Sequence, residues 1–212
     1  MDMVVLSDPE VVGIPVVECG EPLIDVRKIA ALRVDGRLAD PQGCFARLRV
    51  GMVDRLVTAQ TLLPAGLRFL IVEGYRPAEL QKQYFDAFVH RLRVKDPAAA
   101  EADLRRRAAR YISPPEVAPH VAGAAVDVTL CTVYGAELAM GTEVNDTDTT
   151  ACHTDSTEID ARAIQNRRLL GAALSAAGLV NYPSEWWHWS YGDRYWAYVS
   201  GAGHACYGPA EV

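Results

Sequence analysis

The chain has 212 residues, of which 50% are hydrophobic and 23% are charged, and its formal net charge at pH 7 is −6. This length and composition fit one globular domain with a sizeable core and exclude a disordered or fibrous chain. The acidic balance argues against a nucleic-acid partner, because the arginine run at 105–107 lies in an alanine-rich, helix-forming segment with acidic neighbours.

The sequence carries no sign of a membrane segment or of an oxidising compartment. Its first 22 residues lack a basic stretch followed by an unbroken apolar one, and no apolar run approaches the roughly 18 residues of a membrane span. The five cysteines are widely spaced and form no CxxC pair, which is typical of reduced, mostly buried thiols. We expect a cytoplasmic protein with neither a membrane nor a nucleic acid as partner.

The first half of the chain begins with scattered valines and prolines, which predict an extended arm over residues 1–24 and a single domain over residues 25–212. Apolar residues then recur near the helical period from Phe45 to Leu63, and Pro64-Ala65-Gly66 ends this predicted helix. The run from Leu67 to Glu73 follows at once and predicts a buried strand.

A turn at Gly74-Tyr75-Arg76-Pro77 leads out of that strand. Because proline suits the first turn of a helix, we expect a helix at about 78–94, with a second at about 98–111. The β-branched, alternating run from Val126 to Leu130 predicts a strand that carries Asp127.

The last third of the chain opens with a polar stretch, residues 141–158, which predicts a long surface loop. The apolar spacing over 159–177 predicts a helix with Gly178 as its cap. The region that follows, 179–196, is rich in aromatic residues and is predicted to form short strands. Because helices and strands do not alternate regularly, the fold class is predicted as α+β, a compact single domain with a central antiparallel sheet flanked by helices.

Four side chains carry the chemistry of the sequence: His120, Asp127, Glu185 and His188. Together they offer three nitrogen or oxygen ligands and one extra carboxylate, which is the set of a catalytic zinc site with an open fourth position. Gly123 lies in the seven-residue gap and allows the chain to turn from a loop at His120 into the strand that carries Asp127.

Each of these side chains also has a structural explanation. A lone histidine beside an apolar stretch is more often a structural imidazole than a ligand. However, Asp127 would be costly to bury among alanine and valine without a cation, which a metal would supply. Three tryptophans surround Glu185 and should raise its pKa toward that of a general base, unless they form the core and Glu185 makes a salt bridge at the surface.

Several segments, in order from about Asp25 to Trp196, resemble the zinc D-alanyl-D-alanine dipeptidases of the vancomycin-resistance type. They are Val72-Glu73-Gly74-Tyr75-Arg76-Pro77, His120 to Asp127, Met140-Gly141-Thr142, Gln165-Asn166-Arg167-Arg168-Leu169-Leu170 and Glu185-Trp186-Trp187-His188. Ordered motifs at compatible spacing are far more specific than any one of them.

The resemblance implies a role for each matching residue. His120, Asp127 and His188 would bind one zinc ion per chain, Glu185 would be the catalytic base, and Arg76 would stabilise the transition state. It further implies a small peptide as substrate and a compact α+β fold related to the D,D-carboxypeptidases and the hedgehog signalling domain.

Two positions depart from the pattern of that family. Ala118 stands where the family has a serine, and Asn145 aligns best with an aspartate that helps to hold the ammonium group of the substrate. A shifted loop would let Glu143 or Asp146 take over that charge.

Substrate contacts are predicted for four residues, Ala118, Asn145, Tyr75 and Trp187. The remaining histidines, His90, His153 and His204, are assigned to solvated or lid positions rather than to metal binding.

Three hypotheses therefore remain open. The first is a zinc dipeptidase of the D-Ala-D-Ala type or a close relative with an altered substrate preference. The second is a zinc-containing protein of the same fold that binds a ligand without cutting it. The third is an amidase of a biosynthetic pathway. The sequence does not fix the oligomeric state.

Overall fold

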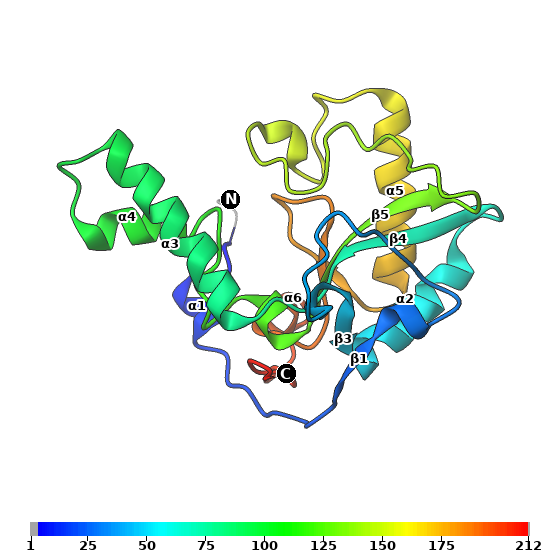
Figure 1. Ribbon diagram of the computed structural model, residues 1–212, viewed down its shortest axis with the longest axis horizontal. Coiled ribbons are helices and arrows are strands. Elements are labelled where there is room, and N and C mark those ends of the chain that lie inside the picture. Colours follow the sequence, from blue (N-terminus) through cyan, green and yellow to red (C-terminus); the bar gives the residue numbers. More distant parts are fainter. Residues whose placement is uncertain (1–3, 212) are drawn as a thin grey trace.

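The computed structural model describes residues 4–211, and its central feature is a five-stranded sheet with the strand order β2-β4-β5-β7-β6 (Figure 1). The strands are β2 (Arg33–Val34), β4 (Leu67–Glu73), β5 (Ala125–Thr132), β6 (Val180–Asn181) and β7 (His188–Ser190). Every pair is antiparallel except β2 with β4 at one edge, which is parallel. The predicted α+β class is confirmed, with one parallel edge strand added to the expected antiparallel sheet.

The predicted helix at 45–63 is wrong in its first residues, which belong to a 3-10 turn and to a second, two-stranded sheet. Strands β1 (Leu23–Asp25) and β3 (Arg47–Arg49) pair antiparallel. The short 3-10 turn η1 (Val26–Lys28) follows β1, a second one, η2 (Cys44–Ala46), precedes β3, and helix α2 (Val50–Leu62) begins only after β3. The pairing partner of β3 comes from a distant part of the chain. So do the carbonyl oxygens that accept hydrogen bonds from the Arg49 guanidinium, which are those of Glu21, Ala122 and Gly208. Local periodicity carries no information about such contacts.

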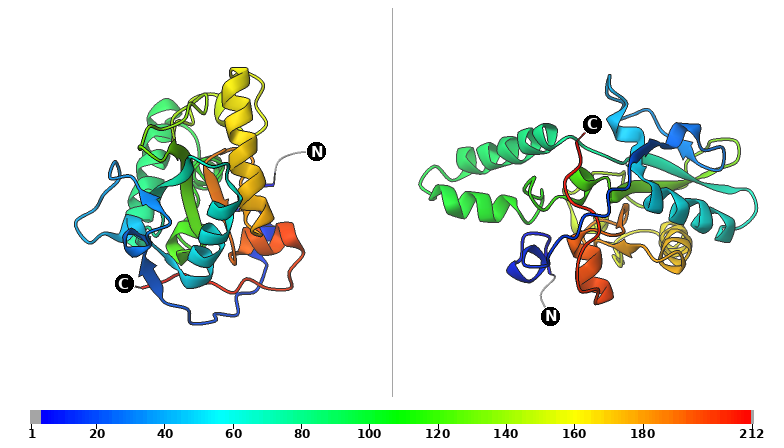
Figure 2. Two further views of the ribbon diagram at one scale, coloured as in Figure 1. Left: turned by 90° about the vertical axis from the view of Figure 1, so that its right-hand side faces the viewer. Right: turned by 90° about the horizontal axis from the view of Figure 1, so that it is seen from below.

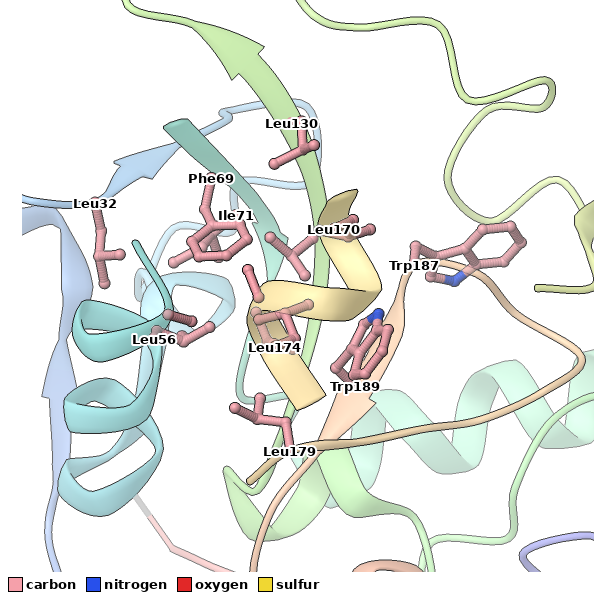
Figure 3. Close-up of a cluster of buried hydrophobic side chains, with 14 of the residues drawn as sticks. Leu32, Leu56, Phe69, Ile71, Leu130, Leu170, Leu174, Leu179, Trp187 and Trp189 are labelled. Carbon is pink, nitrogen blue, oxygen red and sulfur yellow. The ribbon is translucent and has the colours of Figure 1, made fainter. Parts of the chain in front are cut away.

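Helices α2 and α5 (Ala161–Ala176) lie side by side against the sheet and enclose the main core (Figures 1 and 3). Figure 3 shows Leu56 of α2, Phe69 of β4, Leu130 of β5 and Leu174 of α5 meeting there, and all four side chains are fully buried. The apolar stripe of each helix and the inner face of the sheet are thereby removed from water, which is the main stabilising contribution to such a layer.

Helices α3 (Ala78–Lys95) and α4 (Glu101–Ala108) form a hairpin that projects from the body of the protein (Figures 1 and 2). The hairpin has a small core of its own, made by Phe85, Val89, Leu104, Ala108 and Ala109. The arginine run on α4 pairs with hairpin carboxylates, as expected for a solvated helix face: Arg105 with Asp86, Arg106 with Asp103, and Arg107 with Asp96 and Asp103.

The predicted loop at 141–158 contains one 3-10 turn, η4 (Thr150–Cys152). The Arg167 guanidinium on α5 donates hydrogen bonds to carbonyl oxygens of Met140, Ala151 and His153, at 2.7–2.9 Å. The loop is therefore fastened to the helix near both of its ends. The Asp160 side chain accepts a hydrogen bond from the backbone N–H of Ala163 and so caps the N-terminus of α5.

The predicted N-terminal arm contains a short helix, α1 (Pro9–Val12), which packs against helix α6 (Arg194–Ser200) near the other end of the chain. Residues 1–3 of the arm and Val212 lie outside the described residues, and the domain boundary at residue 24 stays a prediction. All five cysteines are free, and three of them are buried. Within residues 4–211, no helix has the length and apolarity that a bilayer crossing requires.

Leu174→Ala should lower the free energy of unfolding by about 2–5 kcal/mol, because it leaves a cavity between α5 and the sheet where the side chain is fully buried. Leu62→Ala is the matched control: this leucine ends α2 and is 52% exposed, so less than about 0.5 kcal/mol should be lost. Urea denaturation measures both values. Equal losses would contradict this assignment of the core.

Candidate metal and catalytic centre

The register of three neighbouring strands brings the first polar side chains of the site together. Asp127 of β5 is paired directly with Glu73 of β4 on one side and with His188 of β7 on the other. Directly paired residues point to the same face of a sheet, with their Cβ atoms about 4.5–5.5 Å apart. A register shift between Ile71 and Glu73 re-aims the end of β4 at this point.

His120 reaches the same place from η3 (Pro119–Ala122), a buried 3-10 turn just before β5. Gly123 ends this turn with φ +64°, and a Cβ atom there would come within 2.2 Å of Leu23. Glycine is therefore required where the chain reverses toward the sheet. The turn between His120 and the strand of Asp127 that the sequence predicts is present in the structure.

The three candidate ligand atoms lie as close together as a zinc ion requires. Asp127 Oδ1 is 3.1 Å from His188 Nδ1 and 3.3 Å from His120 Nε2, and the two ring nitrogens are 3.2 Å apart. A tetrahedral zinc ion about 2.0–2.1 Å from each ligand needs donor atoms about 3.3–3.4 Å apart. Within the described part of the chain, this is the one cluster of at least three such side chains that could hold a metal.

A hydrogen bond to the backbone prepares the His120 imidazole for this role. His120 Nδ1 lies 2.6 Å from the carbonyl oxygen of Gly74, so it carries the proton and leaves the lone pair on Nε2 facing Asp127. His188 Nε2 is buried without a hydrogen-bond partner among the described residues. Burial by itself would raise the pKa of Asp127, but both histidines together outweigh this effect and hold the pKa well below its usual range. The carboxylate is therefore ionised and ready to bind a cation.

Glu185 lies at the edge of this cluster, with Oε2 3.9 Å from His188 Nδ1. Burial and, to a smaller extent, the charge of Asp127 raise the pKa of Glu185 to about 7, against the opposing effect of His188 and Arg76. The alternative of a core tryptophan beside a surface salt bridge is met only in its first part. The neighbouring Trp187 belongs to the core, but Glu185 makes no ion pair with an arginine or lysine among the described residues. Its surroundings are those of a general base.

The Arg76 guanidinium faces the same space and is held by two buried side chains. Nε donates to Glu73 Oε1 at 2.8 Å, Nη2 donates to the other oxygen of the same carboxylate, and Nη1 donates to Gln81 Oε1 at 2.7 Å. These bonds use three of the five N–H groups and leave two free. Glu73 belongs to one of the sequence motifs, but the sequence predicts no role for it or for Gln81. A carboxylate at the end of a buried apolar strand is the signal that would have found Glu73.

These side chains line a cavity of about 440 Å³. Ala118 and Asn145, two of the predicted substrate contacts, line it as well, together with Asp146 and Asp148 of the loop.

Tyr75 and Trp187 do not line this cavity, so the structure does not support their predicted substrate contacts. The Tyr75 hydroxyl points away and donates to the carbonyl oxygen of Ala210, and the Trp187 ring is fully buried in the core (Figure 3). An aromatic residue beside a catalytic motif can serve either the site or the core, and its neighbours in the fold decide which. The histidines assigned to other positions, His90, His153 and His204, also lie outside the cavity.

Most of the chain is similar to known peptidases. Residues 24–201 match the peptidase M15 family model, described as D-ala-D-ala dipeptidase. The chain is 27% identical to a D-alanyl-D-alanine dipeptidase of Synechocystis sp. over 88% of both chains, and 29% identical to one of Escherichia coli K12 over 58% of this chain and 55% of that one. The LD-carboxypeptidase LdcB shares the fold with a TM-score of 0.51, at 18% identity over 86% of this chain and 73% of its own.

Replacing Glu185 by glutamine should stabilise the metal-free protein in a pH-dependent way. Because folding raises the pKa of this carboxyl from 4.5 to about 7, its ionisation disfavours the folded state, from just above pH 4.5 and fully above pH 7. The variant should thus gain about 1–3 kcal/mol over the wild type near pH 8, relative to any difference near pH 4. Urea unfolding with a chelator present measures this gain, and a difference that stays constant with pH would contradict the raised pKa.

Proposed function

Because the chain belongs to the peptidase M15 family of D-Ala-D-Ala dipeptidases, we propose that it is a zinc-dependent dipeptidase that hydrolyses the amide bond of D-Ala-D-Ala or a closely related small peptide. Membership of this family makes the chain a metallopeptidase. One observation carries the finer assignment: three ligand atoms lie within 4.8 Å of one another, with the Glu185 carboxylate 3.9 Å from one of them.

In this proposal His120, Asp127 and His188 hold the zinc ion through Nε2, Oδ1 and Nδ1. Zinc bound by three protein ligands supplies a water molecule whose pKa falls to about 7, and it polarises a peptide carbonyl. The chain contributes the geometry of the site, because strand pairing and the Gly74 carbonyl oxygen keep all three donors aimed at one point.

Glu185 acts as the general base. It takes a proton from the attacking water and returns it to the amide nitrogen of the leaving amino acid, so that one carboxylate serves both steps. A pKa of about 7 suits both directions of transfer at neutral pH. A tight turn holds the residue in place, since its backbone N–H donates to Tyr182 and its carbonyl oxygen accepts from the backbone N–H of His188.

Arg76 faces the carbonyl oxygen as negative charge develops on it. Its two remaining N–H groups can donate to that oxygen while the Glu73 carboxylate fixes the plane of the guanidinium. Glu73 is a positioning residue, because it acts on the substrate through Arg76. Preorganised donors of this kind contribute on the order of 100 to 1,000 fold in rate.

The loop wall of the cavity supplies the partner for the ammonium group of the substrate. Asn145, where the family pattern has an aspartate, adopts a left-handed conformation with φ +69°, and the carboxylates of Asp146 and Asp148 line the cavity just beyond it. Glu143, the other candidate for this charge, does not line the cavity. We assign ammonium binding to Asp146, with Asp148 as the second negative charge.

Two alternatives share this site. A ligand-binding protein without turnover would have the same cavity, and the departures at Ala118 and Asn145 are the reason to consider it. Such a protein would not need a carboxyl group with a pKa of about 7 beside the metal ligands. A biosynthetic amidase would use the same chemistry on another amide. Cytoplasmic location stays a prediction from the sequence.

The purified protein should contain one zinc ion per chain and should hydrolyse D-Ala-D-Ala. Glu185→Gln should keep the metal and lose at least about 100-fold in kcat, because general-base catalysis contributes about 10²–10⁴-fold. Elemental analysis and ninhydrin detection of free alanine measure the two properties. A zinc-free wild type that is inert on D,D-, L,D- and L,L-dipeptides would sink the proposal, and tight binding without turnover would favour the ligand-binding protein.

Asp146→Asn should raise the KM for D-Ala-D-Ala roughly three- to tenfold and leave kcat nearly unchanged, because it removes a solvent-exposed charge contact that exists before and during the reaction. Glu143→Gln is the matched control from the same loop and should behave like the wild type. Steady-state kinetics test the assignment. It fails if both variants have the same KM.

A further inference from the structure

A turn in the N-terminal arm places Leu6 in the wall of the cavity. The backbone N–H of Val5 donates to the Asp8 carboxylate at 2.9 Å, and the backbone N–H of Asp8 donates to the carbonyl oxygen of Val5 at 3.0 Å. These two bonds close a four-residue turn with Leu6 inside it. The Leu6 side chain lines the cavity and is only 5% exposed, so this leucine belongs to the site and not to the outer surface.

The arm is fastened to the body of the protein by helix α6, which lies beside α1 (Figure 2). The Tyr198 hydroxyl donates to Glu10 Oε1 at 3.1 Å, and Arg194 Nε donates to the carbonyl oxygen of Ile14 at 3.0 Å. The family model matches residues 24–201, so this part of the cavity wall lies outside the region that the model covers. The arm therefore brings to the site a side chain that the family match does not account for.

Leu6 reaches the metal ligands through one aromatic ring. Leu6 and Tyr182 belong to the same small apolar cluster, together with Val11 and Tyr195, and both of them also line the cavity. The Tyr182 ring in turn packs edge-on against the His188 imidazole, with 6.0 Å between the two ring centres. The surface that Leu6 and Tyr182 form is thus a place beside the reaction centre where an apolar side chain of a substrate can be buried.

We propose that Leu6 and Tyr182 form the pocket for one side chain of the dipeptide, and that Leu6 determines how large this side chain can be. The proposal rests on the proposed function, because it concerns the same substrate and the same reaction centre. Leu6 cannot move aside without opening the cluster that it forms with Val11 and Tyr195, so the volume of its side chain limits the pocket. A pocket limited in this way favours alanine over larger residues.

Val11 distinguishes this role from that of an anchor for the arm. Its side chain belongs to the same cluster and is 1% exposed, but it does not line the cavity. Replacing either Leu6 or Val11 by alanine removes apolar packing between the arm and the body of the protein. Only the replacement of Leu6 also enlarges the cavity.

The experiment measures kcat/KM for two series of dipeptides, D-Ala-D-Xaa and D-Xaa-D-Ala, in which Xaa is alanine, valine or leucine. Leu6→Ala should raise the ratio of the leucine to the alanine peptide at least about tenfold in one series, because a single methylene in an apolar pocket changes kcat/KM about 10–200-fold. Leu6→Val, which removes one methylene, should give a smaller rise in the same series.

Val11→Ala is the matched control and should leave both ratios within about twofold of the wild type, because it makes no room for a larger side chain. The ratio of two substrates on one protein does not depend on the fraction that is folded, so a loss of stability does not mimic the effect. A rise in neither series, an equal rise in both series, or the same rise in Val11→Ala would each overturn the inference.

A second measurement separates this inference from the proposed function. Calorimetric binding of the same dipeptides to the zinc-loaded Glu185→Gln protein needs no turnover, and adding Leu6→Ala should again favour the leucine peptide of one series at least about tenfold. If this shift is found while the wild type hydrolyses none of the dipeptides, the proposed function alone fails. If the wild type hydrolyses D-Ala-D-Ala and Leu6→Ala changes neither preference, the pocket alone fails.

Discussion

The register of β4, β5 and β7 is the constraint on which the rest of the site depends. Asp127 lies between Glu73 and His188 because the three strands pair at these residues, and a slip by one residue would turn each side chain to the other face. The same register is held from the far side by the main core, whose side chains alternate with the polar ones along β5. Packing energy thereby fixes the geometry of the charged groups.

Two buried pairings of opposite charge share this small space. Asp127 is balanced by the imidazoles of His120 and His188, and Glu73 is balanced by Arg76. An isolated charge would be costly to bury at either position, and pairing with the opposite charge offsets that cost. Among the described residues Glu185 makes no ion pair with an arginine or lysine, and burial raises its pKa to about 7.

The local sequence predicted several of the helices and strands of this protein. The strand Leu67–Glu73, the helix after Pro77 and the strand of Asp127 are all found where the sequence predicts them, because periodicity and turn residues act over a few neighbours. The helix expected from Phe45 was wrong in its first turn, since residues 47–49 pair with β1 instead. A strand that is defined by a partner about two dozen residues away leaves no local pattern.

The candidate site divides in the same way. The sequence by itself determined which residues have metal-binding and basic chemistry, because side-chain type and the cost of burying a carboxylate are local properties. Only the tertiary structure decided that His120 and His188, 68 residues apart, meet at Asp127, and that Trp187 belongs to the core. It also decided that Asp146 and Asp148 line the cavity and that Glu143 does not. The reason is that the surroundings of a side chain are set by long-range pairing and packing, which a single sequence does not display.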